Sequence, residues 1–343
     1  MLGYRKGATQ KDLARHLGVS QSLVSRVLSG KSDPLGVSPA TARRIRHAAR
    51  TAGYQPSPLA TALRGGFTRS FGVVVKDFGD PFFGHLIGEL QTLARRHRYA
   101  LLLTGRESGD LAALSQYVPG GLLILGSDYE PEGLEAHLAR GRRAVRIGRG
   151  DPREGVSQAS MDDTVGLELL LDHLAGLGHR RFGFIGAESA QHRRRGDLLR
   201  GMLDARGWGD DAVFHFFALS TPEAERAGLS RIWTLPPEER PTAIVAADDL
   251  IAHGVLREAT LRGIAVPGRL SLAGIDDLPS SALRVPALTT LRQPIRRMVR
   301  SAFAHLLRES PVAPKDVWVR PELVIRESTG PVPGPDTVKG DEE

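Results

Sequence analysis

Two short segments near the start of the chain carry apolar residues at helical spacing, with polar residues on their other faces. Thr9 can cap the first segment, with Asp12 as the acidic partner of a capping box. Gly18 suits the left-handed backbone that ends a helix, and Ser20 can cap the second segment. The apolar stripe consists of Leu13, Ala14, Leu17, Val24, Val27 and Leu28. We therefore predict two short helices joined by a tight turn.

The second predicted helix has an outward face of side chains that can hydrogen-bond to base edges. In a major groove, Gln pairs with adenine, Arg pairs with guanine, and Ser pairs with either. The face consists of Gln21, Ser22, Ser25 and Arg26. Such a pair of helices is typical of a helix-turn-helix DNA-binding motif. An ordinary helical hairpin with a polar surface is the alternative, and the flanking sequence argues against it.

A third helix and a short linker come next. The helix opens after Ser38, and Arg43 and Arg44 belong to a basic face that suits DNA phosphates. Residues 57–64, with the sequence SPLATALR, are too short for a helix that is stable in isolation. We expect either a plain linker or a hinge that becomes helical on DNA, where Leu63 would wedge into a minor-groove step.

From residue 71 onward, short apolar runs alternate with helical segments. Helices are predicted at about 82–97 and 164–177. Strands separated by helices favour parallel sheets, and their number favours two sheets. We therefore predict an N-terminal all-helical domain, the head, followed in the chain by an α/β domain of two lobes, the body. The predicted strands are 71–76, 100–104, 121–125, 144–147, 158–161, 181–185, 213–217, 242–246 and 271–275.

Polar residues follow many of these strands. They are Asp77, Ser127, Arg149, Asp162, Asp163, Asp248, Asp249, Asp276 and Asp277. Parallel sheets bind ligands beyond the carboxyl ends of their strands, so this pattern predicts a ligand site at those strand ends.

Charge and composition narrow the class of protein. Residues 1–70 hold 12 Lys and Arg against two acids, a net charge of +10, whereas the remainder carries −3. A cationic head on a near-neutral body indicates a polyanionic partner for the head. The absence of cysteine excludes disulfides and thiolate metal sites. No signal peptide or membrane span is apparent, so we expect a cytoplasmic protein without a membrane partner.

Several motifs resemble, in content and order, the LacI/GalR family of bacterial transcriptional regulators. They include VSQSLVSRVLSG and VSPATARRI in the head, and DPFFGHLIGEL, RPTAIVAADD and VPGRLSLAGIDDLP in the body. The resemblance implies a helix-turn-helix domain over 1–56, a hinge helix and linker over 57–69, and an effector-binding, dimerising body over 70–328. The body is similar to periplasmic sugar-binding proteins, with lobe 1 at about 70–161 and 291–320 and lobe 2 at about 162–290 and 321–328. The Pro- and Gly-rich tail, 329–343, is expected to be disordered.

The resemblance also implies residue roles. DNA contacts fall on Gln10, Gln21, Ser22 and Arg26, with Leu63 as the hinge residue that enters the minor groove. Carboxylates and Arg would bind sugar hydroxyls by charge-assisted hydrogen bonds. Effector contacts fall on Asp77, Phe82, Phe83, Ser127, Arg149, Asp163, Asp248, Asp276 and Gln293. A lobe–lobe or capping contact is the alternative for each, and Asp277 is expected to be structural.

The chain departs from the family pattern inside the expected pocket. Asp163 and Asp248 stand where the family often has Asn, and the chain contains no Asn at all. Leu198 stands where the family usually has an effector-binding Arg. Arg194 and Arg195 are nearby substitutes, and facing inward they would suit a phosphorylated or acidic ligand.

We therefore expect a homodimeric, effector-controlled regulator, a repressor rather than an activator, that binds a pseudo-palindromic operator on double-stranded DNA. The effector would be a sugar or a sugar derivative. A solute-binding transport protein is a second hypothesis, which the basic head argues against. An enzyme is a third, but the chain shows no nucleotide-binding glycine motif, catalytic triad spacing or metal-site spacing. No cofactor is expected.

Overall fold

The computed structural model describes residues 8–28, 37–54, 68–106, 110–217, 222–307 and 315–332. They fall into two compact units, Met1–Arg69 and Ser70–Glu343, which we call the head and the body. Most of the predicted hinge, including Leu63, lies outside the described residues. Within the described part of the chain, no helix is both long and apolar enough to cross a membrane.

The head consists of the three predicted helices. They are α1 (Gln10–Leu17), α2 (Gln21–Leu28) and α3 (Pro39–Thr51). The capping box is confirmed, because Thr9 accepts from the Asp12 backbone N–H while the Asp12 carboxylate accepts from Thr9. Gly18 ends α1 in the left-handed conformation, at φ 65°. The buried core of the head is Leu13, Ala14, Val24, Val27, Ala42, Ile45, Ala48, Ala49 and Ala52.

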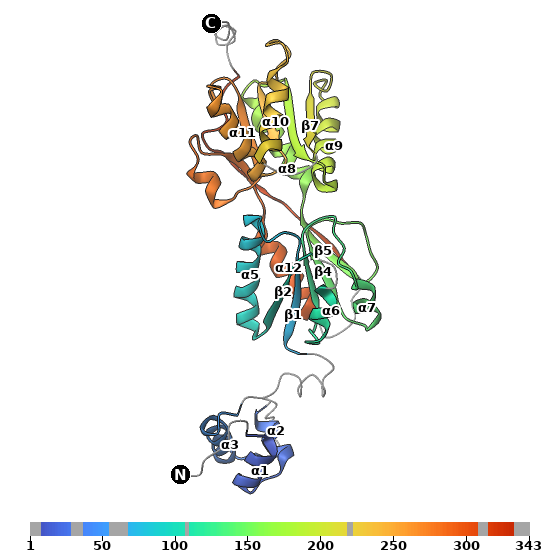
Figure 1. Cartoon of the computed structure of the whole chain (residues 1–343), viewed down its shortest axis with the longest axis vertical. Helices are drawn as coiled ribbons and strands as arrows, with labels where there is room; N and C mark the ends of the chain where they lie inside the picture. The colour runs from blue at the N-terminus through green and yellow to red at the C-terminus, as the bar shows by residue number, and fades with distance from the viewer. Residues whose placement is uncertain are drawn as a thin grey trace. The chain divides into compact units, whose positions relative to one another are not determined.

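The body contains two six-stranded sheets. They lie in two separate lobes (Figure 1). In spatial order the first sheet is β11 (Asp316–Val319), β5 (Val156–Met161), β4 (Ala144–Ile147), β3 (Leu122–Leu125), β1 (Ser70–Val75) and β2 (Ala100–Thr104). The second sheet is β12 (Glu322–Val324), β10 (Thr289–Arg292), β9 (Ser271–Asp276), β8 (Ala243–Ala246), β6 (Phe182–Ala187) and β7 (Val213–Phe217). Every pairing is parallel except that of β10 with β12. The predicted parallel α/β architecture is confirmed.

Helices cover both faces of each sheet (Figure 1). In the first lobe they are α5 (Pro81–His97), α6 (Asp110–Ser115), α7 (Leu134–Ala139) and α12 (Ile295–Leu307). In the second lobe they are α8 (Asp163–Gly176), α9 (Ala190–Asp204), α10 (Pro222–Trp233), α11 (Asp249–Leu261) and the short 3₁₀ helix η1 (Pro279–Leu283). The chain crosses between the lobes three times, after β5, after β10 and after β11. Each lobe is thus built from segments that are distant in sequence.

Three strands and the start of the tail differ from the sequence predictions. The residue pattern did not indicate β10, β11 or β12, which have only three or four residues each. Disorder from Thr329 was also wrong for the first tail residues. Thr329 Oγ1 lies 3.0 Å from His173 Nε2, and the Val332 N–H donates to the Leu177 carbonyl over 2.9 Å. These bonds hold residues 329–332 against the second lobe, and residues 333–343 lie outside the described chain.

His179 joins this tail to the second sheet. The fully buried imidazole donates from Nε2 to the Gly330 carbonyl over 3.0 Å, while Nδ1 lies 2.9 Å from Thr242 Oγ1. Ser271 Oγ lies 2.9 Å from Nε2 as well. Burial lowers the pKa of His179, so the ring is neutral in the folded protein.

We predict that His179→Ala lowers the free energy of unfolding by about 1–3 kcal/mol, because buried polar partners lose their hydrogen bonds. The folded pKa lies below the unfolded value near ~6.5, so this difference is fully present above that pH and shrinks as the pH falls. Urea unfolding at several pH values measures it. His85→Ala, at an exposed position on α5, is the control, and equal losses for both variants would contradict the assignment.

Candidate ligand-binding site and nucleic-acid interface

A cavity of about 240 Å³ lies between the two lobes, where strand ends of both sheets meet. We call it the interlobe cavity. Both lobes contribute polar side chains to its wall. Eight of the predicted effector residues line it: Asp77, Phe82, Phe83, Ser127, Arg195, Asp248, Asp276 and Gln293. The volume is below the roughly 300–1,000 Å³ of pockets for drug-sized ligands, so it suits a single-ring molecule.

Four helices begin beside this cavity because each follows a strand end that faces it. Asp80 caps α5 by accepting from the Phe82 N–H over 2.9 Å. Asp248 caps α11 by accepting from the Ile251 N–H over 2.7 Å. Asp162 and Ser189 cap α8 and α9 in the same way. The caps satisfy backbone donors that would otherwise point into the cavity.

Arg195 is the most deeply buried cation of the site, with 2% of its surface exposed. Its Nε donates to Asp163 Oδ1 over 2.9 Å, and Nη1 donates to the Ala247 carbonyl over 2.6 Å. Burial opposes the charge, but attraction by Asp163, Asp276 and Asp248 outweighs it and raises the pKa of Arg195. The guanidinium therefore stays charged and draws these carboxylates together.

For the carboxylates on the cavity wall, a raised pKa favours the neutral form rather than the charged one. Burial raises the pKa of Asp80 to about 6, and it raises the pKa of Asp276 well above its ordinary value. Burial raises the pKa of Asp248 too. Gln293 Nε2 donates to Asp276 Oδ1 over 2.5 Å, which helps to hold that carboxylate in place. The negative charges therefore lack full compensation within the protein.

His192 completes the wall as a neutral hydrogen-bond donor. Its Nδ1 accepts from the Ala187 backbone N–H over 3.1 Å, so the ring proton is assigned to Nε2. Nε2 lies 3.3 Å from Asp248 Oδ2. Burial, reinforced by repulsion from Arg195, lowers the pKa of His192 to about 3. The imidazole thus orients Asp248 without neutralising it.

Three of the expected effector residues, two implied by the resemblance and one offered as a substitute for the missing Arg, do not line the cavity. Asp163 lies behind its wall, where it binds Arg195. Arg194 instead spans the two lobes, with Nη2 2.6 Å from Asp128 Oδ1. The Arg149 guanidinium lies over the Trp318 ring, 5.0 Å from its centre. The two arginines point elsewhere because a carboxylate and an aromatic face are available to them outside the cavity.

Leu198, which stands where the resemblance places an effector-binding Arg, does not line the cavity, and Arg195 lines it instead. Leu198 is half-buried against the core of the second lobe, so it neither reaches the cavity nor leaves a charge missing there. His192 and Arg195 lie one turn apart at the N-terminal end of α9 and both line the cavity. Leu198 is three residues after Arg195 and therefore lies about 4.5 Å further along the helix axis, away from that end.

Residue patterns did not single out three titratable residues of the cavity wall, namely Lys76, Asp80 and His192. Asp80 had a usable signal, because an Asp directly before Pro81 is a common N-cap arrangement at a helix start. His192 lies inside a run of arginines and gave no such signal. Lys76 follows the first strand directly and is half-buried.

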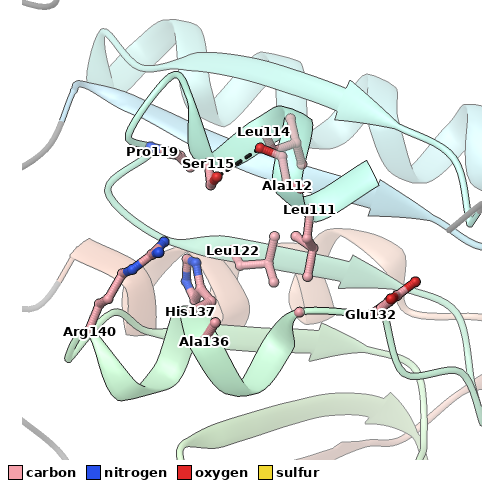
Figure 2. A pocket seen from close by; sticks show the side chains of 11 residues that line it. Leu111, Ala112, Leu114, Ser115, Pro119, Leu122, Glu132, Ala136, His137 and Arg140 are labelled. Carbon is pink, nitrogen blue, oxygen red and sulfur yellow. Dashed lines mark hydrogen bonds between the residues drawn. The ribbon is translucent and has the colours of Figure 1, made fainter. Parts of the chain in front are cut away.

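A second hollow, of about 230 Å³, lies between α6 and α7 on the first lobe (Figure 2). Leucines and alanines dominate its wall. Ser115 Oγ donates to the Ala112 carbonyl over 2.7 Å, and His137 Nε2 lies 3.1 Å from the Arg143 carbonyl. Those polar groups are engaged with the protein's own backbone rather than aimed at a common point. The interlobe cavity is therefore the better candidate for recognition of a polar ligand.

One cluster of Asp, Ser and His bears on the enzyme hypothesis. Ser281 Oγ donates to Asp249 Oδ2 over 2.6 Å, and His253 Nε2 lies 2.9 Å from Ser281 Oγ. A hydrolytic triad needs the His between the Ser and the carboxylate, with the Ser accessible. Here the fully buried Ser281 lies in the middle, so its hydroxyl is tied to Asp249. Among the described residues, no cluster of His, Asp and Glu suits a metal ion either.

The polar face of α2 that is predicted to contact base edges lies on the surface of the head. Gln21, Ser22 and Arg26 are exposed, and Ser25 is half-buried. Gln10, also half-buried, begins α1. On α3, Arg43 and Arg44 are exposed, and Arg44 Nη2 lies 3.5 Å from the Leu17 carbonyl. The core of the head therefore keeps the polar face of α2 outward, as a helix that enters a groove requires.

Comparisons with known proteins match both units. Residues 9–57 match the bacterial regulatory protein model of the lacI family, and residues 171–329 match a periplasmic binding protein-like domain. The chain is 28% identical to the HTH-type transcriptional repressor PurR of Mannheimia succiniciproducens, over 94% of this chain and 98% of that protein. It is 29% identical to the HTH-type transcriptional regulator GalS of Salmonella typhimurium, over 86% and 87%.

A solved structure extends the likeness to the whole fold. The lac repressor dimer bound to operator and the anti-inducer ONPF aligns with a TM-score of 0.80 at 21% identity, over 95% of this chain and all of that one. That likeness supports the two-unit, two-sheet architecture described above.

We predict that Arg195→Ala lowers the free energy of unfolding by about 3–5 kcal/mol, because it leaves buried carboxylates without their cation. Arg193→Ala, on the same helix, removes an exposed ion pair with Glu188 and the contact of the guanidinium with the Phe216 ring, and should cost about 1–2 kcal/mol at most. Urea unfolding of both variants makes the comparison. A similar cost for the two would show that Arg195 does not organise the site.

Proposed function

We propose that this chain, which belongs to the LacI family of bacterial regulatory proteins, regulates transcription by binding a DNA operator under the control of a small molecule in the interlobe cavity. One observation carries the proposal: a single chain combines a helix-turn-helix head with an exposed polar reading face and a body with a buried, charged cavity. A DNA-binding head needs no ligand cavity, and a ligand-binding body needs no DNA-binding head, so their combination in one chain supports ligand-controlled DNA binding.

The head supplies both kinds of DNA contact. Gln21, Ser22 and Arg26 are proposed to contact base edges, with Ser25 and Gln10 beside them. Arg43 and Arg44 are proposed to contact phosphates and so fix the register of the head. Two heads of a homodimer would then occupy the halves of a pseudo-palindromic operator. Insertion of Leu63 into the minor groove stays a prediction.

The body is proposed to act as a two-state switch. The chain crosses between the lobes three times, so a ligand that binds both walls can change how the lobes close. The Arg194–Asp128 ion pair already joins the lobes outside the cavity. A ligand controls operator affinity only through its different affinity for the two states, and such coupling is typically about 1–3 kcal/mol.

A repressor is the favoured form of this regulator, because the PurR relative is named a transcriptional repressor and aligns over 98% of its length. An activator of the same family is the alternative, and a reporter gene downstream of the operator distinguishes them. Carboxylates and a guanidinium at a small cavity support a sugar or a sugar derivative as effector. Such a regulator works beside the chromosome, in the cytoplasm.

A solute-binding protein would need only the body. The charge of +10 over residues 1–70 has no purpose in that role, whereas it suits a phosphate backbone. Specific DNA binding by the full chain is the observation that separates the two hypotheses.

We predict that selection from a random duplex library yields a two-fold symmetric site, and that Arg26→Ala reduces discrimination against mismatched bases by about 1–3 kcal/mol. Arg43→Ala should instead weaken binding to all sequences and reduce the salt slope by about 1. Fluorescence anisotropy at several salt concentrations measures both effects. Enrichment of no sequence at physiological salt would refute the proposed function, and an unchanged preference in Arg26→Ala would refute that residue's role.

A further inference from the structure

Negative charge outweighs positive charge on the wall of the interlobe cavity. The charged lining residues are the cations Lys76 and Arg195 and the acids Asp77, Asp80, Asp248 and Asp276. His192 also lines the cavity, but its pKa of about 3 keeps it neutral. Counted as fully ionised, the wall carries a net charge of −2, and burial raises the pKa of Asp80, Asp248 and Asp276. A ligand of positive charge would stabilise the ionised forms of these carboxylates, whereas a ligand of negative charge would be repelled by them.

The two cations do not balance the acids, because both are engaged by further carboxylates. Arg195 binds Asp163, which lies behind the wall and adds one more negative charge to the surroundings. Burial lowers the pKa of Lys76, and its strongest attraction is to Asp128 rather than to the cavity acids. Among the described residues, Asp80, Asp248 and Asp276 thus accept hydrogen bonds from neutral groups but form no ion pair with a Lys or Arg.

The helix N-termini around the cavity would ordinarily favour an anionic ligand. Here the protein's own side chains occupy them. Asp80 caps α5, Asp162 caps α8 and Asp248 caps α11, while the Ser189 hydroxyl caps α9. A phosphate would have to displace these caps or lie against three carboxylates. The N-termini therefore do not create a phosphate site.

The hydrogen-bonding groups on the cavity wall also favour a ligand that donates hydrogen bonds. His192 Nε2 and Gln293 Nε2 face Asp248 and Asp276, so these donors are engaged. Ser127 Oγ accepts from the Arg149 backbone N–H over 3.0 Å. A carboxylate accepts about four hydrogen bonds, which leaves several acceptor positions for a ligand. A ligand rich in donors matches this wall, and an ammonium group offers three donors and no acceptor.

We propose that the effector carries an ammonium group and is a single-ring amino sugar, whose ammonium lies among Asp80, Asp248 and Asp276. The phenyl rings of Phe82 and Phe83, also on the wall, offer an apolar surface to the sugar ring. The inference rests on the proposed function, since it assumes that the interlobe cavity is the effector site. It replaces the expectation of an acidic ligand, because Arg194 points away and Arg195 is surrounded by acids.

The test compares matched sugars by isothermal titration calorimetry on the full chain at pH 7.5. The probes are glucosamine, galactosamine and mannosamine, each beside its neutral parent, its N-acetyl form and its 6-phosphate. We expect at least one amine to bind tenfold or more tightly than its neutral parent, with loss of that advantage on N-acetylation. Tighter binding of a neutral or phosphorylated sugar, or binding of none of the amines, would overturn the proposal.

A variant pair and a pH series identify the source of the preference. Asp276→Asn should reduce the amine-to-parent affinity ratio tenfold or more, whereas Asp197→Asn, at an exposed position of α9 outside the cavity wall, should change it less than threefold. If Asp276→Asn does not fold, Asp80→Asn takes its place. Equal ratios in the paired variants would overturn the proposal.

The pH series uses the wild-type chain and needs no substitution. Asp80 faces Lys76 and Asp77 on its own segment and Asp248 at the start of α11. Since the pKa of Asp80 is about 6, protonation should weaken amine binding as the pH falls from 7.5 to 5.5, while binding of the neutral parent stays constant. An amine affinity that does not change over this range would contradict the inference. Operator selection tests the head separately, so its failure and that of the amine test are distinguishable.

Discussion

The Arg195 guanidinium is the charge around which the body of this protein is arranged. It is almost completely buried, binds Asp163 and the Ala247 carbonyl, and attracts Asp248 and Asp276 from neighbouring strand ends. A buried cation of this kind is tolerated only when carboxylates surround it. Their number exceeds what one cation balances, and burial raises the pKa of those that face the cavity between the lobes. The polarity of the candidate effector site thus follows from the packing of one side chain.

The parallel sheets explain why this charge lies between the lobes. Each parallel strand delivers its carboxyl end, and then a helix N-terminus, to the same edge of its sheet. Asp80, Asp162 and Asp248 cap three of those helices. The caps stabilise the helices and, at the same time, fill with negative charge the positions that would otherwise attract an anion. Fold stability and ligand preference therefore depend on the same residues.

Local patterns predicted the head well because its signals are short in range. The capping box at Thr9, the left-handed Gly18 and the apolar stripes of α1 and α2 each depend on neighbours within a few residues. The residues that line the cavity were harder to predict, because the direction of a side chain depends on partners that are far away in sequence. Arg194 and Arg149 point to Asp128 and Trp318, and spacing along the chain contains no information about either contact. The short strand β12 likewise exists only through its pairing with β10.

The central claim is that occupancy of the interlobe cavity controls the affinity of the head for DNA. Thermodynamic linkage tests it directly: the operator dissociation constant is measured with and without a saturating sugar, and the sugar dissociation constant with and without operator. If the cavity controls DNA binding, both constants change by the same factor, on the order of 5–150-fold. An operator affinity that stays the same when the cavity is saturated would contradict it.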